Sequence, residues 1–203
     1  MPLGKAQDVD FSFLEAQLEA EGADNLGWVF ERNLVFETTP PSLHAQGKLL
    51  RLRANCTSTD VHYLTTLKLQ ARANTQYKIC EELEVVPTSG QQMNAFLLGL
   101  GYHVFAKYEK FRCSYRLGTV KIDLDILPFG RFVELEGGDL AVIASKLGLQ
   151  AYKTSVASYH ELHKNWQAAH GQSFEPSFVF SDSELHRLCA LLGIVLNDAT
   201  LQF

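Results

Sequence analysis

The sequence predicts an α+β fold in which an antiparallel sheet curls into a barrel and helices pack on its outside. Short segments of alternating polar and apolar residues follow one another over residues 47–86 and again over 108–136. Around them lie a few segments with apolar residues at helical spacing, preceded by residues that cap helices. Because closure removes exposed sheet edges, many strands with few helices favour a barrel.

The N-terminal part of the chain contributes one helix and several strands. Asp10 can cap a helix whose apolar residues recur at helical spacing until Gly22 ends it. Residues 28–38 are rich in aromatic and β-branched residues and predict a strand. Three further strands are expected at residues 47–53, 62–70 and 77–86.

The clearest strands are residues 108–117, 120–127 and 131–136, which are separated by two turns rich in Gly and Pro. Alternate side chains of a strand point to opposite faces. One face of these strands is therefore apolar, and the other concentrates charge of both signs. The charged residues on it are Lys110, Arg112, Arg116, Lys121, Asp123, Asp125, Glu134 and Glu136.

Four helices are expected outside the first one. Ser89 and Gln92 fit a capping box, Asp139 can cap the next helix, and Ser181 with Glu184 fits a second capping box. Tyr159, Leu162 and Trp166 mark a further helix between them. We expect residues 1–171 to form one domain, with residues 172–203 as a C-terminal helical extension packed on it.

Composition excludes several classes of protein. With 203 residues, 46% hydrophobic and 20% charged, the chain can bury a core. A net charge of −5 argues against general nucleic-acid binding. No apolar run approaches the roughly 20 residues of a membrane span, and residues 1–10 lack the apolar core of a signal peptide. The four cysteines form no CxxC pair, so neither a zinc site nor a disulfide framework is indicated, and a reducing cytoplasm is the default location.

The charged sheet face has two interpretations. It can be the solvated side of an antiparallel sheet, which commonly has one apolar and one polar face. It can also line the lumen of a barrel, where Arg and Lys would hold a polyanion and carboxylates a hard cation. The earlier strands add residues of the same parity, which are Arg51, Arg53, Lys68, Lys78, Glu82 and Glu84.

An ordered set of short segments favours the lumen. The set consists of LRLR at 50–53, TLK at 66–68, EELE at 81–84, YEKFR at 108–112, KIDLD at 121–125, FGRFVELEG at 129–137 and LGL at 147–149. In its order and spacing, the sequence over roughly residues 10–165 resembles the CYTH superfamily, the triphosphate tunnel metalloenzymes. The last segments are most similar to the branch of class IV adenylyl cyclases.

This resemblance implies an eight-stranded antiparallel barrel, incomplete if its first strand is missing, that binds a triphosphate with Mg²⁺ or Mn²⁺. It implies substrate-binding roles for Lys5, Arg51, Arg53, Lys68, Lys110 and Arg112. It implies metal-binding roles for Glu82, Glu84, Asp125, Glu134 and Glu136. Asp123, Lys78, Arg116 and Lys121 have the right parity but weaker motif support, and no catalytic residue is assigned.

One departure from the family leaves two functions open. The family begins with a strand carrying ExExK, but here Met1 and Leu3 stand at the glutamate positions before Lys5, and Cys80 stands where arginine is common. The first hypothesis is an enzyme that hydrolyses or cyclises a triphosphate such as ATP, thiamine triphosphate or tripolyphosphate. The second is a triphosphate-binding protein without catalysis. The sequence leaves the oligomeric state open, a homodimer included.

Two other candidate sites have simpler explanations. His160 and His163 are three residues apart on an expected helix, but no neighbouring Cys or carboxylate pattern completes a metal site, so a surface or packing role is expected. The Gly99-Leu100-Gly101 segment is followed by no helix, which favours a helix stop over a phosphate loop.

Overall fold

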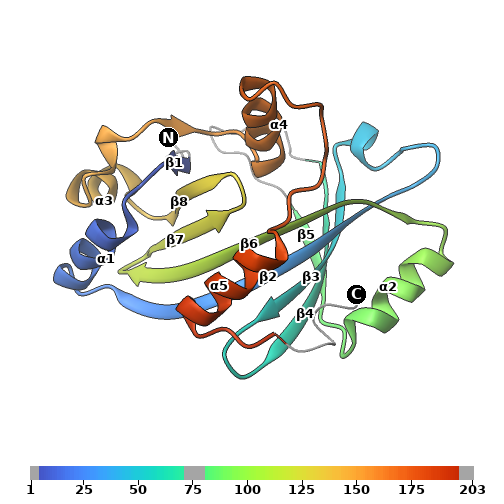
Figure 1. Ribbon diagram of the computed structural model, residues 1–203, viewed down its shortest axis with the longest axis horizontal. Coiled ribbons are helices and arrows are strands. Elements are labelled where there is room, and N and C mark those ends of the chain that lie inside the picture. Colours follow the sequence, from blue (N-terminus) through green and yellow to red (C-terminus); the bar gives the residue numbers. More distant parts are fainter. Residues whose placement is uncertain (1–4, 71–80, 197–203) are drawn as a thin grey trace. The chain divides into compact units, whose positions relative to one another are not determined.

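The computed structural model describes residues 5–70 and 81–196. In this part of the chain an antiparallel sheet of nine strands has the order β5-β4-β3-β2-β6-β7-β8-β1-β9, and five α-helices accompany it (Figure 1). The order ends at β5 and β9, so within the described residues the sheet does not close. The predicted α+β class is confirmed. Met1, Leu3, Lys78 and Cys80 lie outside the described residues.

The chain divides into two compact units, residues 1–28 with 110–178 and residues 29–109 with 179–203. The strands β2 (Asp24–Glu37) and β6 (His103–Leu117) run through both. The other elements of the first unit are β1 (Lys5–Gln7), α1 (Phe11–Ala20), β7 (Val120–Leu127), β8 (Gly130–Gly137), α3 (Leu140–Lys146), β9 (Thr154–Ser155) and α4 (Tyr159–Ala169). Those of the second are β3 (Leu49–Cys56), β4 (Val61–Lys68), β5 (Glu82–Val85), α2 (Gly90–Gly99) and α5 (Asp182–Leu192).

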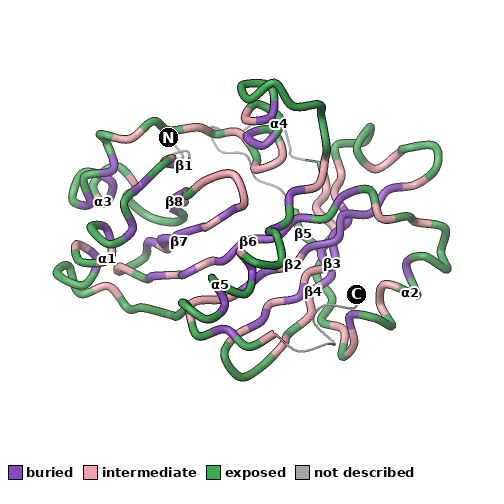
Figure 2. Tube along the Cα trace, in the orientation of Figure 1, coloured by how far each residue is buried: buried purple, intermediate pink, exposed green. Residues whose placement is uncertain are grey.

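The core of the first unit lies between the apolar face of its strands and the helices α1 and α3. Cys113, Ile122 and Leu124 are fully buried and belong to one cluster with Leu18 of α1 and Ala144 of α3. Figure 2 shows β7 buried along most of its length, whereas α1 and α3 are largely exposed. The apolar parity predicted for residues 108–136 is therefore the core-facing side.

Helix starts follow the predicted caps. The side chain of Asp10 accepts a hydrogen bond from the backbone N–H of Ser12 at 3.0 Å, and Ser89, Asp139 and Ser181 occupy the N-caps of α2, α3 and α5. These short oxygen acceptors satisfy backbone donors that have no partner within the helix. The complete capping box of α4, which Ser158 and Glu161 form, was not predicted.

Glycine is required where β8 ends. Gly137 has φ +111°, and a Cβ atom there would approach the carbonyl oxygen of Thr119 to 2.3 Å. The turn between β6 and β7 therefore packs directly on the backbone of β8. This close approach keeps β7 in register with β8, with Val120 opposite Gly137.

The cysteines and helices of the described residues bear on the expectations from composition. Cys56, Cys113 and Cys189 are buried free thiols. None of the helices in residues 5–70 and 81–196 combines the length and the apolar character needed to cross a membrane.

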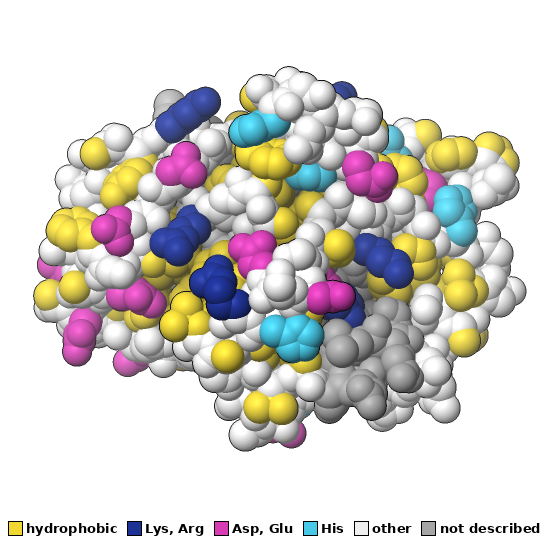
Figure 3. All heavy atoms as spheres, viewed as in Figure 1, with side chains coloured by type: hydrophobic (Ala, Val, Ile, Leu, Met, Phe, Trp, Pro, Cys, Tyr) yellow, Lys and Arg dark blue, Asp and Glu magenta, His cyan; other side chains and the backbone are white. Residues whose placement is uncertain are grey.

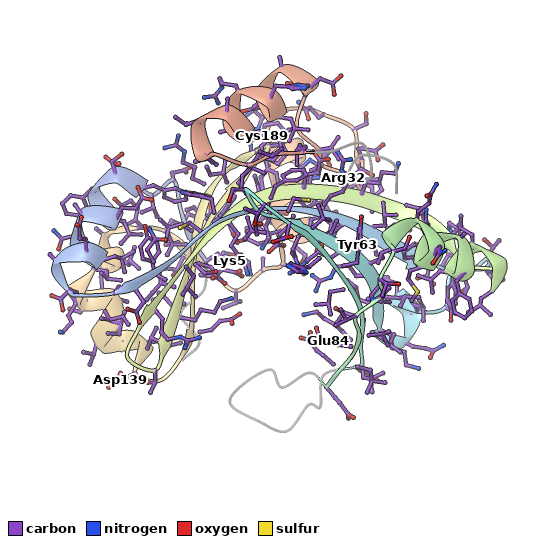
Figure 4. The ribbon with its side chains drawn as sticks, turned by 90° about the horizontal axis from the view of Figure 1, so that it is seen from below. Lys5, Arg32, Tyr63, Glu84, Asp139 and Cys189 are labelled. Atoms are coloured by element: carbon purple, nitrogen blue, oxygen red, sulfur yellow. The ribbon has the colours of Figure 1, made fainter. Side chains whose placement is uncertain are left out.

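The second unit holds the C-terminal helix α5 through a buried carboxylate. Glu109 on β6 is only 2% exposed. It accepts a hydrogen bond from Arg32 Nε at 2.8 Å and from the backbone N–H of Phe180 at 3.0 Å. Cys189 lies on the side of α5 that faces the sheet (Figure 4) and is buried as well. The described C-terminal residues 179–196 therefore pack on the strands of the second unit.

Replacing Glu109 with Ala should lower the free energy of unfolding by about 3 kcal/mol. The half-buried charge of Arg32 loses this carboxylate, and the backbone N–H of Phe180 loses the acceptor that Glu109 provides. Chemical denaturation measures this loss. The matched control is Glu184→Ala, which removes an exposed ion pair with Arg187 on α5 and should change stability by no more than about 0.5 kcal/mol. Equal effects of the two substitutions would contradict the anchoring role.

Candidate functional site

The charged face of the first unit contains two rows of residues that are directly opposed across β6, β7 and β8. In one row Arg112 pairs with Asp125, and Asp125 pairs with Phe132. In the next, Ser114 pairs with Asp123, and Asp123 with Glu134. Directly opposed residues of neighbouring strands project to the same face. Arg112, Asp123, Asp125 and Glu134 therefore meet as one set, which together with Lys110 on β6 we call the acid–base cluster.

Arg112 is the centre of the acid–base cluster. Its Nη1 lies 2.8 Å from Asp123, its Nε donates to Asp125 at 2.6 Å, and its Nη2 donates to Glu134 at 2.6 Å. A guanidinium offers a rigid fork of donors, and charge-assisted bonds of this kind hold it in one orientation. The position of Arg112 is thus set by carboxylates on both β7 and β8.

Asp125 is completely enclosed by donors. The residue is 0% exposed, and besides Arg112 its carboxylate accepts from Lys110 Nζ at 3.3 Å and from the hydroxyl of Tyr159 at 2.6 Å. Burial alone would raise the pKa of this carboxyl, but the charges of Lys110 and Arg112 hold the pKa well below its usual range. Asp125 therefore stays ionised and orients its basic neighbours.

Lys5 and Tyr159 complete the cluster from outside β6–β8. Lys5 Nζ lies 2.8 Å from Glu134 and 4.9 Å from the ring centre of Tyr159. Lys110 lies over the same ring at 5.5 Å. Burial and the charge of Asp125 raise the pKa of Tyr159 well above its ordinary value, so its hydroxyl remains a donor. Lys5, to which the family resemblance gives a substrate-binding role, therefore lies beside the acid–base cluster.

The remaining acids of the first unit differ in how far they are engaged. Asp123 accepts from Ser114 Oγ at 2.6 Å and from Lys121 Nζ at 2.8 Å. Glu136 is exposed, and no partner of its side chain lies among the described residues. Glu136 is consequently the acid of this face with the most freedom to bind a ligand.

Arg51 and Arg53 on β3 form the basic cluster of the second unit. Arg53 Nε donates to Asn33 at 2.8 Å and its Nη2 lies 3.2 Å from Glu31. Arg51 donates to the hydroxyl of Tyr108 at 3.0 Å. Both arginines project to the same face of β3, as their alternation with Leu52 predicts.

Arg51 differs from the other buried cations. It is only 8% exposed, its Nη2 reaches Thr66 Oγ1 at 3.5 Å, and its Nε has no hydrogen-bond partner within the described chain. Over the same residues no carboxylate lies within ion-pair distance of it. The direct hydrogen-bond partners of the guanidinium are therefore neutral hydroxyls, while the charges of Glu31 and Glu82 act on it from beyond contact distance.

The two acids predicted on β5 face polar partners on the neighbouring strand β4. Lys68 and Glu82 are opposite each other, with Nζ and Oε1 2.8 Å apart. Glu84 is opposite Thr66 and accepts its hydroxyl at 3.3 Å. Figure 4 shows Glu84 on β5, which is an edge strand of the described sheet.

The predicted metal-binding carboxylates could contact a metal ion only two at a time. Across residues 5–70 and 81–196, no group of three or more His, Cys, Asp or Glu side chains converges. Glu82 with Glu84, and Glu134 with Glu136, each place two carboxylates on one strand face. Mg²⁺ is commonly bound by one or two carboxylates together with waters and substrate phosphates. The two glutamate pairs fit this pattern, whereas Asp125 has its oxygens occupied by other donors.

The histidines of α4 pack against aromatic rings, as expected. The ring of His160 lies 5.1 Å from that of Phe178, and the ring of His163 lies 5.0 Å from that of Phe129. Figure 3 shows histidine and apolar side chains gathered around α4. Burial lowers the pKa of both histidines, which favours the neutral rings.

Some residues of the clusters were missed in the sequence. Tyr108 shares the parity of Lys110 and Arg112, so the alternation could have identified it. Asn33 and Glu31 lie two residues apart on β2 and so share one face of the strand. The same alternation could therefore have identified them as well. Tyr159 lies on a helix, 34 residues from Asp125, and no pattern in the sequence connects the two.

Comparisons with known proteins agree with this architecture. Residues 7–140 match the model of the CYTH domain. No curated protein matches the chain. Among solved structures, a candidate adenylate cyclase from Vibrio parahaemolyticus is 21% identical with TM-score 0.64, and the match covers 79% of this chain and 95% of that one. A protein of Pyrococcus horikoshii is 24% identical with TM-score 0.64, covering 80% and 99%.

A third similar structure is a candidate adenylyl cyclase from Hippeastrum with a dominant triphosphatase activity. It is 18% identical with TM-score 0.61, and the match covers 87% of this chain and 99% of that one. At these identities the likeness of the three structures shows a shared fold.

Asp125→Asn should destabilise the chain by about 3 kcal/mol at neutral pH, because it removes a buried charge that compensates Lys110 and Arg112. The folded-state pKa is depressed, so this contribution is present above the unfolded value of about 3.9 and is lost as the pH falls below it. The difference between wild type and variant should hold from about pH 8 to 5 and shrink below pH 4. Denaturant unfolding across this range measures it.

Asp139→Asn is the control for this pH series. Asp139 is an exposed N-cap of α3, and Asn caps helices about as well as Asp. The control should leave stability nearly unchanged. A loss in Asp125→Asn that persists undiminished at low pH would show that the ionised carboxylate is not its cause.

Proposed function

The chain belongs to the CYTH family, and from this premise we propose that it binds a triphosphate together with a divalent metal ion and acts on it as a triphosphatase or an adenylyl cyclase-like enzyme. The proposed phosphate-binding residues are Lys5, Arg51, Arg53, Lys68, Lys110 and Arg112. The proposed metal-binding residues are Glu82, Glu84, Glu134 and Glu136. Asp125 is proposed to orient Lys110 and Arg112.

The environment of Arg51 is the observation that carries the proposal. Burying a charge is unfavourable unless an opposite charge or several hydrogen bonds compensate it. Arg51 is buried beside the neutral hydroxyls of Tyr108 and Thr66, and its Nε points to no acceptor in the described chain. Glu31 and Glu82 act on Arg51 only from beyond contact distance, so a phosphate oxygen would supply a directly bonded anion and suits the planar fork of an arginine.

The acid–base cluster suggests how metal and phosphate binding are coupled. Glu134 contacts both Lys5 and Arg112, so these cations are partly neutralised without a ligand. A carboxylate that turns toward a divalent cation releases its basic partners to phosphate oxygens. Glu134 would therefore link the two binding events.

The chemistry follows from this arrangement. A bound Mg²⁺ or Mn²⁺ supplies polarisation of a phosphoryl oxygen and offsets developing charge. The basic side chains fix the triphosphate for in-line attack and stabilise the same charge. Water as nucleophile gives hydrolysis, and the 3′-hydroxyl of a nucleotide gives cyclisation; the same binding residues serve both.

The second candidate is a triphosphate-binding protein without catalysis. Met1 and Leu3 stand where the family has two metal-binding glutamates, which reduces the carboxylates available to a metal but not the basic residues. Incubation of ATP and of tripolyphosphate with each metal, read for phosphate, pyrophosphate and cyclic AMP, separates the two candidates. Binding without turnover supports the second.

Arg51→Ala should weaken tripolyphosphate binding about tenfold or more, because each charge-assisted hydrogen bond contributes about 1.5–3 kcal/mol. Calorimetry measures the affinity, and a melting curve verifies folding. The control is Arg187→Ala on α5, whose side chain is 64% exposed, and it should bind like wild type. An unchanged affinity in folded Arg51→Ala would refute the assignment.

Glu134→Gln should raise the metal concentration needed for activity, while metal-free tripolyphosphate binding stays intact or strengthens as Lys5 and Arg112 lose a competing anion. A metal titration of turnover, or of binding if there is none, tests this. Glu21→Gln, which alters the exposed pair with Lys146, is the control. A purely structural Glu134 would instead lower the melting temperature with no change in metal dependence.

A further inference from the structure

A pocket of about 600 Å³ lies in the first unit, outside the residues assigned so far. It is bounded by the strands β1, β8 and β9 and by the helix α4, with Gln7, Phe129, Phe132, Ser155, Asn165 and Trp166 among its walls. Small-molecule sites typically measure about 300–1,000 Å³. The pocket therefore has the size of a ligand site.

The pocket continues the ladder row that contains Arg112. Along this row Arg112 pairs with Asp125, Asp125 with Phe132, and Phe132 with Gln7. Phe132 and Gln7 line the pocket, and neighbouring strands are about 4.8 Å apart. The pocket thus begins one strand away from the acid–base cluster and on the same face of the sheet.

Tyr159 forms the boundary between the two regions. Its hydroxyl donates to Asp125 at 2.6 Å, and its ring packs edge-on against Phe132 with centres 5.3 Å apart. Lys5 lies over the Tyr159 ring and precedes Gln7 on β1. Tyr159 therefore contacts both Lys5, beside the acid–base cluster, and Phe132 of the pocket wall, so the two regions adjoin at this residue.

Aromatic rings provide flat walls. Trp166 stacks on His170 with ring centres 4.4 Å apart, and both line the pocket. Phe129 lies 6.2 Å from Trp166 and 5.5 Å from Phe132, so a chain of rings connects α4 with β8. Planar heteroaromatic groups stack favourably on such surfaces.

The polar side chains at the pocket have free hydrogen-bonding capacity. The side chains of Gln7, Asp8 and Asn165 line it and make no hydrogen bond to other described residues of the chain. Amide and carboxylate groups match the mixed donors and acceptors on the edge of a heteroaromatic ring. Lys153 also lines the pocket; an inorganic phosphate chain would contact this cation but would use neither the amide groups nor the rings.

We propose that this pocket binds the planar heteroaromatic group of an organic triphosphate whose phosphates contact Lys5 and Arg112. This inference rests on the proposed function and narrows its substrate class to triphosphates that carry such a group. The chain should accordingly bind them more tightly than tripolyphosphate.

Tryptophan fluorescence gives a direct test, because the chain has only two tryptophans, Trp28 and Trp166. In the full-length Trp28→Phe variant the signal comes from Trp166 alone. ATP should change this emission with saturation, whereas tripolyphosphate should bind, as calorimetry measures, without changing it. GTP, CTP and thiamine triphosphate, titrated in parallel, identify which ring system fits best.

Affinity measurements on pocket variants complete the test. Trp166→Ala should weaken binding of the preferred organic triphosphate about tenfold, in the range of one lost stacking contact, and leave tripolyphosphate affinity within about twofold. Asn165→Ala, at an exposed position of α4, should shift the same ratio with less risk to folding. Phe174→Ala, which removes an aromatic ring that is 61% exposed and outside the pocket, is the control and should change neither affinity.

The outcomes separate this inference from the proposed function. If wild type binds tripolyphosphate at least as tightly as every organic triphosphate, or if both pocket variants lose affinity for both ligand types equally, the pocket assignment is overturned while triphosphate binding stands. If wild type binds no triphosphate at all, the proposed function fails and the inference with it.

Discussion

The buried carboxylate of Asp125 imposes the main constraint on the first unit. An ionised group without solvent needs several donors around it, and here they come from Lys110 and Arg112 on β6 and from Tyr159 on α4. Meeting this requirement ties the helix to the sheet and gives Arg112 one orientation. The position of Lys5 follows, because Glu134 is shared between Lys5 and Arg112.

The two clusters are electrostatically different. In the first unit each cation of the acid–base cluster has a carboxylate within ion-pair distance, so a ligand has to displace an anion. In the second unit Arg51 is hydrogen-bonded only to neutral hydroxyls, and Glu31 and Glu82 act on it from farther away, so an anion could bind it without displacing a contacting carboxylate. We therefore expect a bound metal ion to affect phosphate binding at Lys5 and Arg112, which share Glu134, more than phosphate binding at Arg51. Buried ion pairs contribute little net stability, which is consistent with retaining these groups for binding.

The same strand register that assembles the charges also forms the neighbouring pocket. Asp125, Phe132 and Gln7 follow one another across β7, β8 and β1, so the change from charged to aromatic lining occurs within one ladder row. Recognition of phosphate and recognition of a ring system would then depend on one rigid part of the sheet. A rigid support of this kind reduces the entropy lost when a ligand binds.

The sequence by itself determined what depends on short-range pattern. Alternation placed Arg112, Asp123 and Glu134 on one face, and their contacts confirm it; the caps Asp10, Ser89 and Asp139 were also correct. The strands β1 and β9 have only three and two residues, too few for a period, so the sheet order around Lys5 came from the tertiary structure alone. The donors that surround Asp125 likewise come from the tertiary structure. A carboxylate in a strand has the same parity whether it binds a metal or orients an arginine, and the difference lies in how many donors, including a tyrosine 34 residues away, the fold brings to it.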